Sequence, residues 1–202
     1  SRGLRRLLCL PERRRLILRG LAGAVAVSSS IEEELIAAGV PAAKIRRIPF
    51  GVNLARFRPV DPDRRRVLRQ KLGVRWNQVL LFVGEISARK RPHWLLPALQ
   101  TLRDRGRDVG LLLVGPVKDV AYWEQLKIKA AKLCVSDKIE WKGFSREIWE
   151  YYNVADLFVL PSENEGLPNA MLEALASGVP AVCSNVSGCL DVLGDGACGR
   201  VI

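Results

Sequence analysis

The sequence predicts an α/β fold in which helices cover both faces of a parallel sheet. From residue 79 onward, short apolar segments alternate with segments of helical periodicity. The apolar segments are continuous rather than alternating, which is typical of strands that are buried on both faces. The repeated order of strand, helix and strand favours parallel pairing through crossover connections. The expected architecture is therefore a Rossmann-like domain.

The expected elements of this sheet can be placed along the chain. The predicted strands are 79–84, 110–115, 138–142, 156–161, 179–183 and 199–202. The predicted helices are 91–105, 122–133, 146–154 and 169–177. Because ligands of such sheets bind outside the carboxyl ends of the strands, we expect a site along the rim formed by Gly84, Gly115, Gly143 and residues 161–166.

The first 75 residues do not continue this alternation. Residues 22–27 predict a strand. Ser30 and Glu33 have the spacing of a capping box and predict a helix that runs toward Gly39. A charged helix near 62–72 then precedes the complete sheet.

A lone strand and helix before a complete sheet indicate two domains. We interpret residues 1–60 as the tail of a preceding domain together with an interdomain linker, and residues 61–202 as the second domain. The chain also stops inside the predicted strand 199–202. Both ends are therefore expected to be truncated.

Positive charge is concentrated in the first third of the chain. The net charge is +11, made up of +12 in residues 1–75 and −1 in residues 76–202. A nucleic-acid-binding domain is expected to carry its basic patch on the folded body, which here is neutral, so the sequence does not predict nucleic acid as a partner. The open alternative for the arginine-rich start is a helix on an anionic membrane surface.

The apolar runs and the cysteines bear on location and metal binding. Runs such as 79–84 are far shorter than the ~20 residues that span a bilayer. The five cysteines form no C-x-x-C pair and lie far from the single histidine, so no zinc site is predicted. An odd number of thiols among apolar neighbours is typical of buried cysteines in a reducing compartment. We therefore expect a cytoplasmic protein, peripheral at a membrane if its first residues bind lipid.

The segment 162–173, Ser-Glu-Asn-Glu-Gly-Leu-Pro-Asn-Ala-Met-Leu-Glu, carries the candidate chemistry. Glu165 lies in the turn after a predicted strand, and Glu173 lies about one turn into the following helix. The N–H groups at a helix N-terminus attract phosphate, and carboxylates accept strong hydrogen bonds from hydroxyls. The segment therefore suits a nucleotide diphospho-sugar, although two glutamates at this spacing also occur on solvated helix faces.

This segment resembles the retaining glycosyltransferases of family 4, which have the GT-B fold. Their C-terminal domain carries an E-x7-E motif, which Glu165 and Glu173 match. Flanking segments resemble the strand before the motif, the segment after it and the later glycine-rich turns of the family: 155–162, 175–182, 187–191 and 195–199. The likeness extends over roughly residues 22–202 and implies the C-terminal half of a GT-B glycosyltransferase.

The resemblance implies roles for individual residues. Glu165 would hold the transferred sugar near the reaction centre, and Glu173 would bind the ribose hydroxyls. The backbone at Gly166 and Leu167 would lie near the sugar and the diphosphate, and Phe144 would lie near the base.

The diphosphate end of this site departs from the family pattern. The family uses an arginine and a lysine five residues apart after the first strand. Here Lys90 matches the lysine, but Glu85 stands at the position of the arginine. Glu85 directly follows Gly84, which is also assigned to the donor site. A carboxylate at 4 Å from a phosphate would repel it by ~1–4 kcal/mol. Either Glu85 turns away and Arg89 or Arg91 compensates, or donor binding is weakened.

The implied reaction is transfer of a sugar from a nucleotide-diphosphate sugar to an acceptor, with retention of configuration and without metal or cofactor. Lys90 would stabilise the leaving diphosphate, and together with Glu165 it is assigned as catalytic. The acceptor, a glycan, lipid or small molecule, would bind mainly to the missing N-terminal domain, so these 202 residues are expected to be inactive alone. Two alternatives stay open: a non-catalytic nucleotide-sugar-binding module and a sugar-nucleotide epimerase of similar fold.

Overall fold

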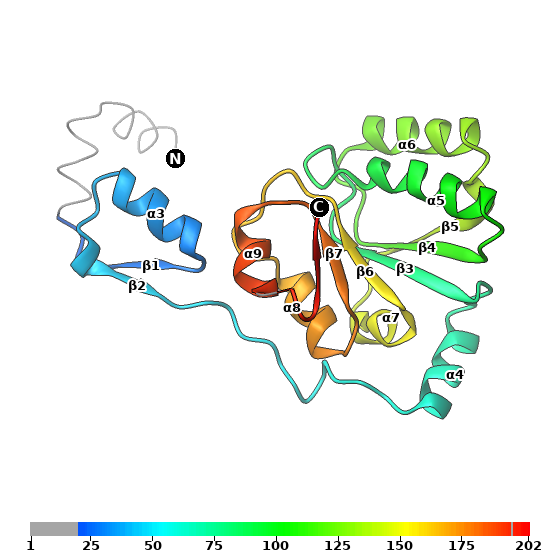
Figure 1. Ribbon diagram of the computed structural model, residues 1–202, viewed down its shortest axis with the longest axis horizontal. Coiled ribbons are helices and arrows are strands. Elements are labelled where there is room, and N and C mark those ends of the chain that lie inside the picture. The colour runs from blue at the N-terminus through cyan, green and yellow to red at the C-terminus, as the bar shows by residue number, and fades with distance from the viewer. Residues whose placement is uncertain (1–19, 195) are drawn as a thin grey trace. The chain divides into compact units, whose positions relative to one another are not determined.

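The computed structural model describes residues 20–194 and 196–202, which belong to two units (Figure 1). Described residues up to Phe50 form the first unit, and residues from Gly51 to Ile202 form the second. The arginine-rich residues 1–19, for which a membrane-surface helix is the alternative, lie outside the described residues, as does Cys9.

The described part of the first unit contains two short parallel strands and the helix α3. β1 (Ala24–Ala26) pairs with β2 (Ile45–Arg47), and α3 (Ser29–Ala37) and the 3-10 turn η1 (Ala42–Lys44) connect them. The expectation of a lone strand is therefore wrong. β2 has the sequence Ile-Arg-Arg, and only its isoleucine is buried, so it shows no apolar run that a sequence pattern could identify.

The helix α3 begins earlier than its predicted capping box. Ser28 is the N-cap, and its hydroxyl accepts a hydrogen bond from Ile31 N at 3.4 Å. Ser30, predicted as the cap, lies inside the helix, and its hydroxyl is 3.1 Å from that of Ser28. Three consecutive serines made the choice of cap ambiguous, and the extended backbone of Ser28, at φ −147°, decides it.

The second unit is built on a six-stranded sheet whose strands are all parallel, as predicted. The strand order is β5-β4-β3-β6-β7-β8. The strands are β3 (Gln78–Val83), β4 (Val109–Val114), β5 (Ile139–Gly143), β6 (Leu157–Leu160), β7 (Ala181–Cys183) and β8 (Gly199–Val201).

Helices cover both faces of this sheet (Figure 1). One face packs against α5 (Leu95–Asp104), which follows η2 (Pro92–Trp94), and against α6 (Val120–Lys132), which precedes η3 (Ser136–Lys138). The other packs against α4 (Pro62–Lys71), α7 (Ile148–Val154), α8 (Asn169–Ala176) and α9 (Ser187–Leu193). Successive strand residues alternate between the two cores: Leu81 belongs to one and Phe82 to the other, and both are fully buried. This double burial explains the continuous apolar runs.

The helix α9 replaces an expected glycine-rich turn. The family resemblance predicts a turn at residues 187–191, but these residues are helical, so this prediction is wrong. Gly188 serves close packing instead, because a Cβ at this position would overlap the carbonyl oxygen of Gly166. The start of α9 therefore lies directly against the turn that follows Glu165.

Residues 51–60 pack on the second unit. Phe57 is buried beside Tyr152, with 5.9 Å between ring centroids, and Val60 N donates to Asn153 Oδ1 at 3.0 Å. The role of this stretch as an interdomain linker stays a prediction.

The cysteines divide into two groups. Cys183 and Cys189 are buried, as predicted, but Cys134 and Cys198 are exposed, so the expectation of burial is wrong for these two. Both lie in connections, Cys134 after α6 and Cys198 before β8, where an apolar neighbourhood in the sequence does not place a side chain in the core. Within the described ranges, no helix combines the length and apolarity needed to cross a membrane.

The order of the strands creates a crevice at the carboxyl ends of β3 and β6. The chain leaves β3 toward β4 and β5, and then returns to the opposite side of β3 with β6. The connections after these two neighbouring strands therefore lead away from each other, which leaves an opening between them. The residues that follow β3 and β6 meet at this opening.

Candidate active site

A cavity of about 330 Å³ lies at this switch point. Its lining comes from the end of β3 and the loop after it, from the end of β6, and from the turn that leads into α8. The cavity brings together four of the predicted site residues: Gly84, Lys90, Glu165 and Leu167. Three others are not among its lining residues: Gly166, Glu173 and Phe144.

Lys90 and Glu165 form an ion pair in the cavity, although they are 75 residues apart in the sequence. Lys90 Nζ donates to Glu165 Oε1 at 2.5 Å. The side chains are only 15% and 8% exposed. Because both charges are largely removed from water, each needs the other as its partner. The cavity thus holds a cation suited to an anionic ligand and a carboxylate suited to hydroxyls.

The turn after Glu165 is fixed from its far side by α9. Ser187 Oγ donates to Glu165 O at 3.5 Å, and the carbonyl of Gly166 packs against Gly188. Leu167 is buried and lines the cavity. These contacts fix the backbone of the turn that follows Glu165.

Glu85 pairs with Arg89 at the edge of the same cavity. Arg89 Nη2 donates to Glu85 Oε1 at 3.3 Å, and the hydroxyl of Ser87 donates to the same oxygen at 3.3 Å. Both Glu85 and Arg89 line the cavity. The Glu85 carboxylate therefore faces the guanidinium of Arg89, four residues further along the loop.

Two hydrogen bonds and an ion pair join the two loops that flank the crevice. Glu163 N donates to Arg89 O at 2.9 Å, and Arg89 Nη1 donates to Asn164 O at 3.1 Å. Arg91 also pairs with Glu163 at 2.8 Å. The loop after β3 is thus held against the loop after β6.

The N-terminus of α8 opens on the cavity. Pro168 is the N-cap residue and makes no side-chain capping hydrogen bond, and Asn169 and Ala170 line the cavity. The first N–H groups of a helix lack intrahelical partners and carry partial positive charge. This end of α8 adds to the positive potential that Lys90 supplies.

Glu173 is not among the residues that line this cavity. It is half-buried, and its Oε2 accepts a hydrogen bond from Tyr152 Oη at 2.8 Å. Burial raises the pKa of Glu173, while the hydrogen bond from Tyr152 and the charge of Arg56 oppose that rise. Burial likewise raises the pKa of Tyr152 well above its ordinary value, so Tyr152 remains a donor. No sequence pattern pointed to Tyr152, because only the packing of α7 on α8 brings it to Glu173.

Phe144 follows the end of β5 and is 74% exposed. The preceding Gly143 has a left-handed backbone, with φ 66°. Phe144 is thus largely exposed to solvent, and it is not among the residues that line the cavity.

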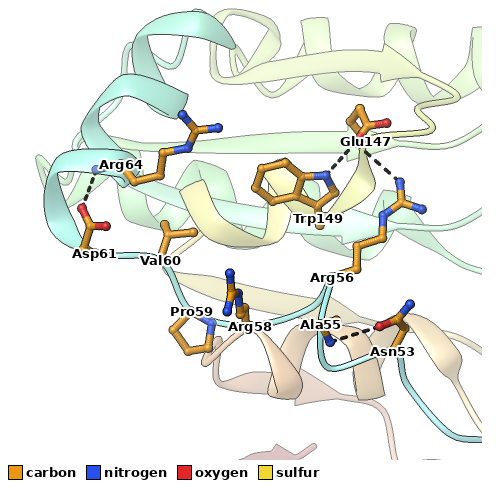
Figure 2. A pocket seen from close by; sticks show the side chains of 10 residues that line it. All are labelled: Asn53, Ala55, Arg56, Arg58, Pro59, Val60, Asp61, Arg64, Glu147 and Trp149. Atoms are coloured by element: carbon orange, nitrogen blue, oxygen red, sulfur yellow. Dashed lines mark hydrogen bonds and ion pairs between the residues drawn. The ribbon is translucent and has the colours of Figure 1, made fainter.

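A second cavity, of about 750 Å³, lies on the same unit and contains none of the predicted site residues (Figure 2). Residues 53–64 form most of its wall, together with Glu147 and Trp149. Figure 2 shows Glu147 bridging Arg56, at 3.6 Å, and the indole N–H of Trp149, at 2.6 Å. Of these two cavities, the smaller is the better candidate, because it joins a largely buried cation and carboxylate at the carboxyl ends of the strands.

Among the described residues, no group of three or more His, Cys, Asp and Glu side chains could hold a metal ion. The positively charged residues that line the smaller cavity are Lys90 and Arg89.

A doubly wound parallel sheet with a charged crevice at its switch point defines a class of nucleotide-binding α/β domains. The particular family follows from comparison with known proteins. Residues 65–202 match the model of the glycosyl transferases group 1 family, and this chain belongs to that family.

Relatives with known activities support the same assignment. Over 171 residues the chain is 32% identical to a GDP-mannose-dependent alpha-(1-6)-phosphatidylinositol monomannoside mannosyltransferase of Mycolicibacterium smegmatis, and the match covers 80% of this chain and 44% of that protein. It is 31% identical over 168 residues to a D-inositol 3-phosphate glycosyltransferase of Streptomyces avermitilis, and the match covers 79% of this chain and 36% of that protein. The chain therefore spans less than half the length of these relatives.

Solved structures share the fold. The Anabaena HepE protein in complex with UDP-glucose has a TM-score of 0.85 at 24% identity, and the match covers all of this chain and 55% of that one. The C-terminal domain of a glycosyl transferase group 1 family protein from Francisella tularensis has a TM-score of 0.67 at 22% identity, with 75% and 80% covered. The predicted C-terminal GT-B architecture is thus confirmed at the level of the fold.

Proposed function

We propose that this chain is the donor-binding half of a retaining glycosyltransferase and that it binds a nucleotide-diphosphate sugar in the smaller cavity. The observation that carries the proposal is the buried pair of Lys90 and Glu165 at the switch point of the sheet. In this assignment the diphosphate binds to Lys90 and to the N-terminus of α8, while the sugar hydroxyls bind to Glu165.

In this proposal the incoming donor replaces the internal ion pair. The diphosphate takes over Lys90, and hydroxyl groups of the sugar satisfy Glu165, so neither buried charge loses its partner. When the bond between the sugar and the diphosphate breaks, negative charge grows on the leaving group, and Lys90 stabilises that charge.

Relatives and neighbours support the donor class without deciding the base. The mycobacterial relative is named for GDP-mannose, and the Anabaena structure contains UDP-glucose. Both ligands are nucleotide-diphosphate sugars, so the shared chemistry is a diphosphate between a nucleoside and a sugar. We assign Glu173 to the ribose and the Gly143–Phe144 backbone to the base, and we assign no metal to the site.

A thermal-shift series with UDP, GDP and ADP tests donor binding. At least one diphosphate is expected to raise the melting temperature of the chain, and Lys90→Gln should abolish that rise. No shift with any of the three would refute the donor site.

Activity assays separate this proposal from its alternatives. The acceptor-binding half is expected elsewhere in the full protein, so the 202-residue chain should bind the donor and transfer no sugar. Sugar transfer by this chain alone would contradict the proposal, and conversion of the donor to an altered sugar nucleotide without an acceptor would favour an epimerase.

The membrane hypothesis for the arginine-rich start is separate. We propose a cytoplasmic protein, and binding of its first 20 residues to anionic vesicles would make it peripheral. Deleting residues 1–20 should abolish any such binding, and unchanged binding would refute this role.

A further inference from the structure

The charged side chains of the smaller cavity form two pairs of opposite sign. Lys90 is paired with Glu165 at 2.5 Å, and Arg89 is paired with Glu85 at 3.3 Å. No other charged residue is among the described residues that line the cavity. Its four charges therefore sum to zero, whereas a diphosphate brings at least two negative charges.

Lys90 does not balance a diphosphate by itself. It is a single positive charge, and it also neutralises the buried carboxylate of Glu165. A second cation with donors free for phosphate oxygens would complete the site.

Arg89 has the geometry of that second cation. Its side chain is 49% exposed, and its guanidinium is anchored by Glu85 on one side and by the carbonyl of Asn164 on the other. These two bonds use two of the five N–H donors of a guanidinium. The backbone of Arg89 is fixed as well, because its carbonyl accepts from Glu163 N at 2.9 Å.

The carboxylate of Glu85 is directed at Arg89. The same oxygen, Oε1, accepts from Arg89 and from the hydroxyl of the buried Ser87. A bare carboxylate here would repel phosphate, but a carboxylate in this arrangement orients a guanidinium at the cavity.

Arg91 is excluded from the same role. Its guanidinium pairs with Glu163 at 2.8 Å and lies 5.0 Å from the centroid of the Trp94 ring. Arg91 is also not among the residues that line the cavity. It therefore offers a matched control, since it is an arginine of the same loop with a carboxylate partner.

We propose that Arg89 is a diphosphate-binding residue of this site and that Glu85 is a positioning residue that holds the Arg89 guanidinium at the cavity. This inference rests on the proposed function, because it assigns the second cation of the same donor site.

Isothermal titration of the 202-residue chain tests the inference. The ligands are UDP, GDP, ADP and the corresponding nucleosides. Arg89→Gln should lower the affinity for the diphosphate that binds best by about tenfold and leave the affinity for the corresponding nucleoside unchanged. The diphosphate affinity of Arg89→Lys should lie between those of the parent chain and Arg89→Gln. Arg91→Gln should change neither affinity. Glu85→Gln should also lower the affinity for the diphosphate, because the Arg89 guanidinium loses the carboxylate that orients it.

Several outcomes would overturn the inference. Tighter diphosphate binding by Glu85→Gln would show that this carboxylate only repels the ligand. Unchanged binding by Arg89→Gln, or an equal loss for diphosphate and nucleoside, would remove Arg89 from the phosphate site. If Lys90→Gln weakens binding and Arg89→Gln does not, this inference fails and the proposed function stands. If the parent chain binds none of the diphosphates, both fail.

Discussion

Replacing Lys90 with methionine tests how strongly the buried ion pair stabilises the second unit. The substitution keeps most of the side-chain volume and removes the charge that pairs with Glu165. The Glu165 side chain is 8% exposed, so its carboxylate would be left without a partner and largely without water.

The expected loss follows from the geometry of the pair. Two unit charges separated by 2.5 Å attract by about 7 kcal/mol at an effective dielectric constant of about 20, and the cost of removing them from water offsets much of this attraction. Breaking a buried pair by removing one partner costs about 3–5 kcal/mol. For a domain of this size, that loss lowers the melting temperature by roughly 6–20 °C.

Thermal and urea unfolding without ligand provide the assay. Lys127→Met is the matched control, because Lys127 pairs with Glu124 at 2.9 Å while both side chains are about half exposed. This control should lose no more than about 0.5 kcal/mol. The double variant Lys90→Met with Glu165→Gln should recover most of the stability, because no buried charge remains. Equal losses in the single variant and the control, or no recovery in the double variant, would refute the reasoning.

Three further predictions concern the glycine packing and two titrating groups. Gly115→Ala should destabilise the second unit by at least about 2 kcal/mol in urea unfolding, because φ is 144° and a Cβ would overlap Gly84 O; a neutral result would show that the strand ends can separate. Burial raises the pKa of Glu173, so the folded state binds its proton more tightly than the unfolded chain, and stability is lost as pH rises through the window just above 4.5. Glu173→Gln should reduce the pH dependence of the urea midpoint in that window, and a pH dependence identical to that of the parent would exclude Glu173 as its source. Burial, and then the charges of Lys129 and Arg91, lower the pKa of His93. The stabilisation that this shift contributes is therefore present above pH 6.5, and it is lost as the pH falls through the pKa of the folded state. His93→Gln should remove that loss in unfolding measured below pH 6.5, and an unchanged pH profile would exclude His93 as its source.

The sequence predicted the parallel sheet because its signal is local. A strand buried on both faces must be apolar at every position, and the runs at β3 and β4 satisfy this condition. The elements that the sequence missed lack such a signal. β2 has a single buried residue. α9 contains Gly188, which is required for close contact with the turn at Gly166 and not for a turn of its own.

The candidate site was predictable only in part. Lys90 and Glu165 each stand in a loop after a strand, and the family resemblance singled out both. The sequence did not show whether Glu85 would face the ligand or a neighbouring cation, because that depends on where a guanidinium four residues away is anchored. Asn164 and Glu85 anchor it together, and they lie on loops that are distant in sequence.

The sequence by itself determined that this chain is an α/β domain with its polar residues at the carboxyl ends of the strands, since hydrophobic periodicity and turn residues act over a few neighbours. Tertiary structure alone decided which of those residues meet. Lys90 reaches Glu165 because β6 returns to the side of β3 opposite β4, which joins loops 75 residues apart at one crevice. Glu173 meets Tyr152 because α8 packs on α7. Such pairings depend on strand order and helix packing, which no local pattern encodes.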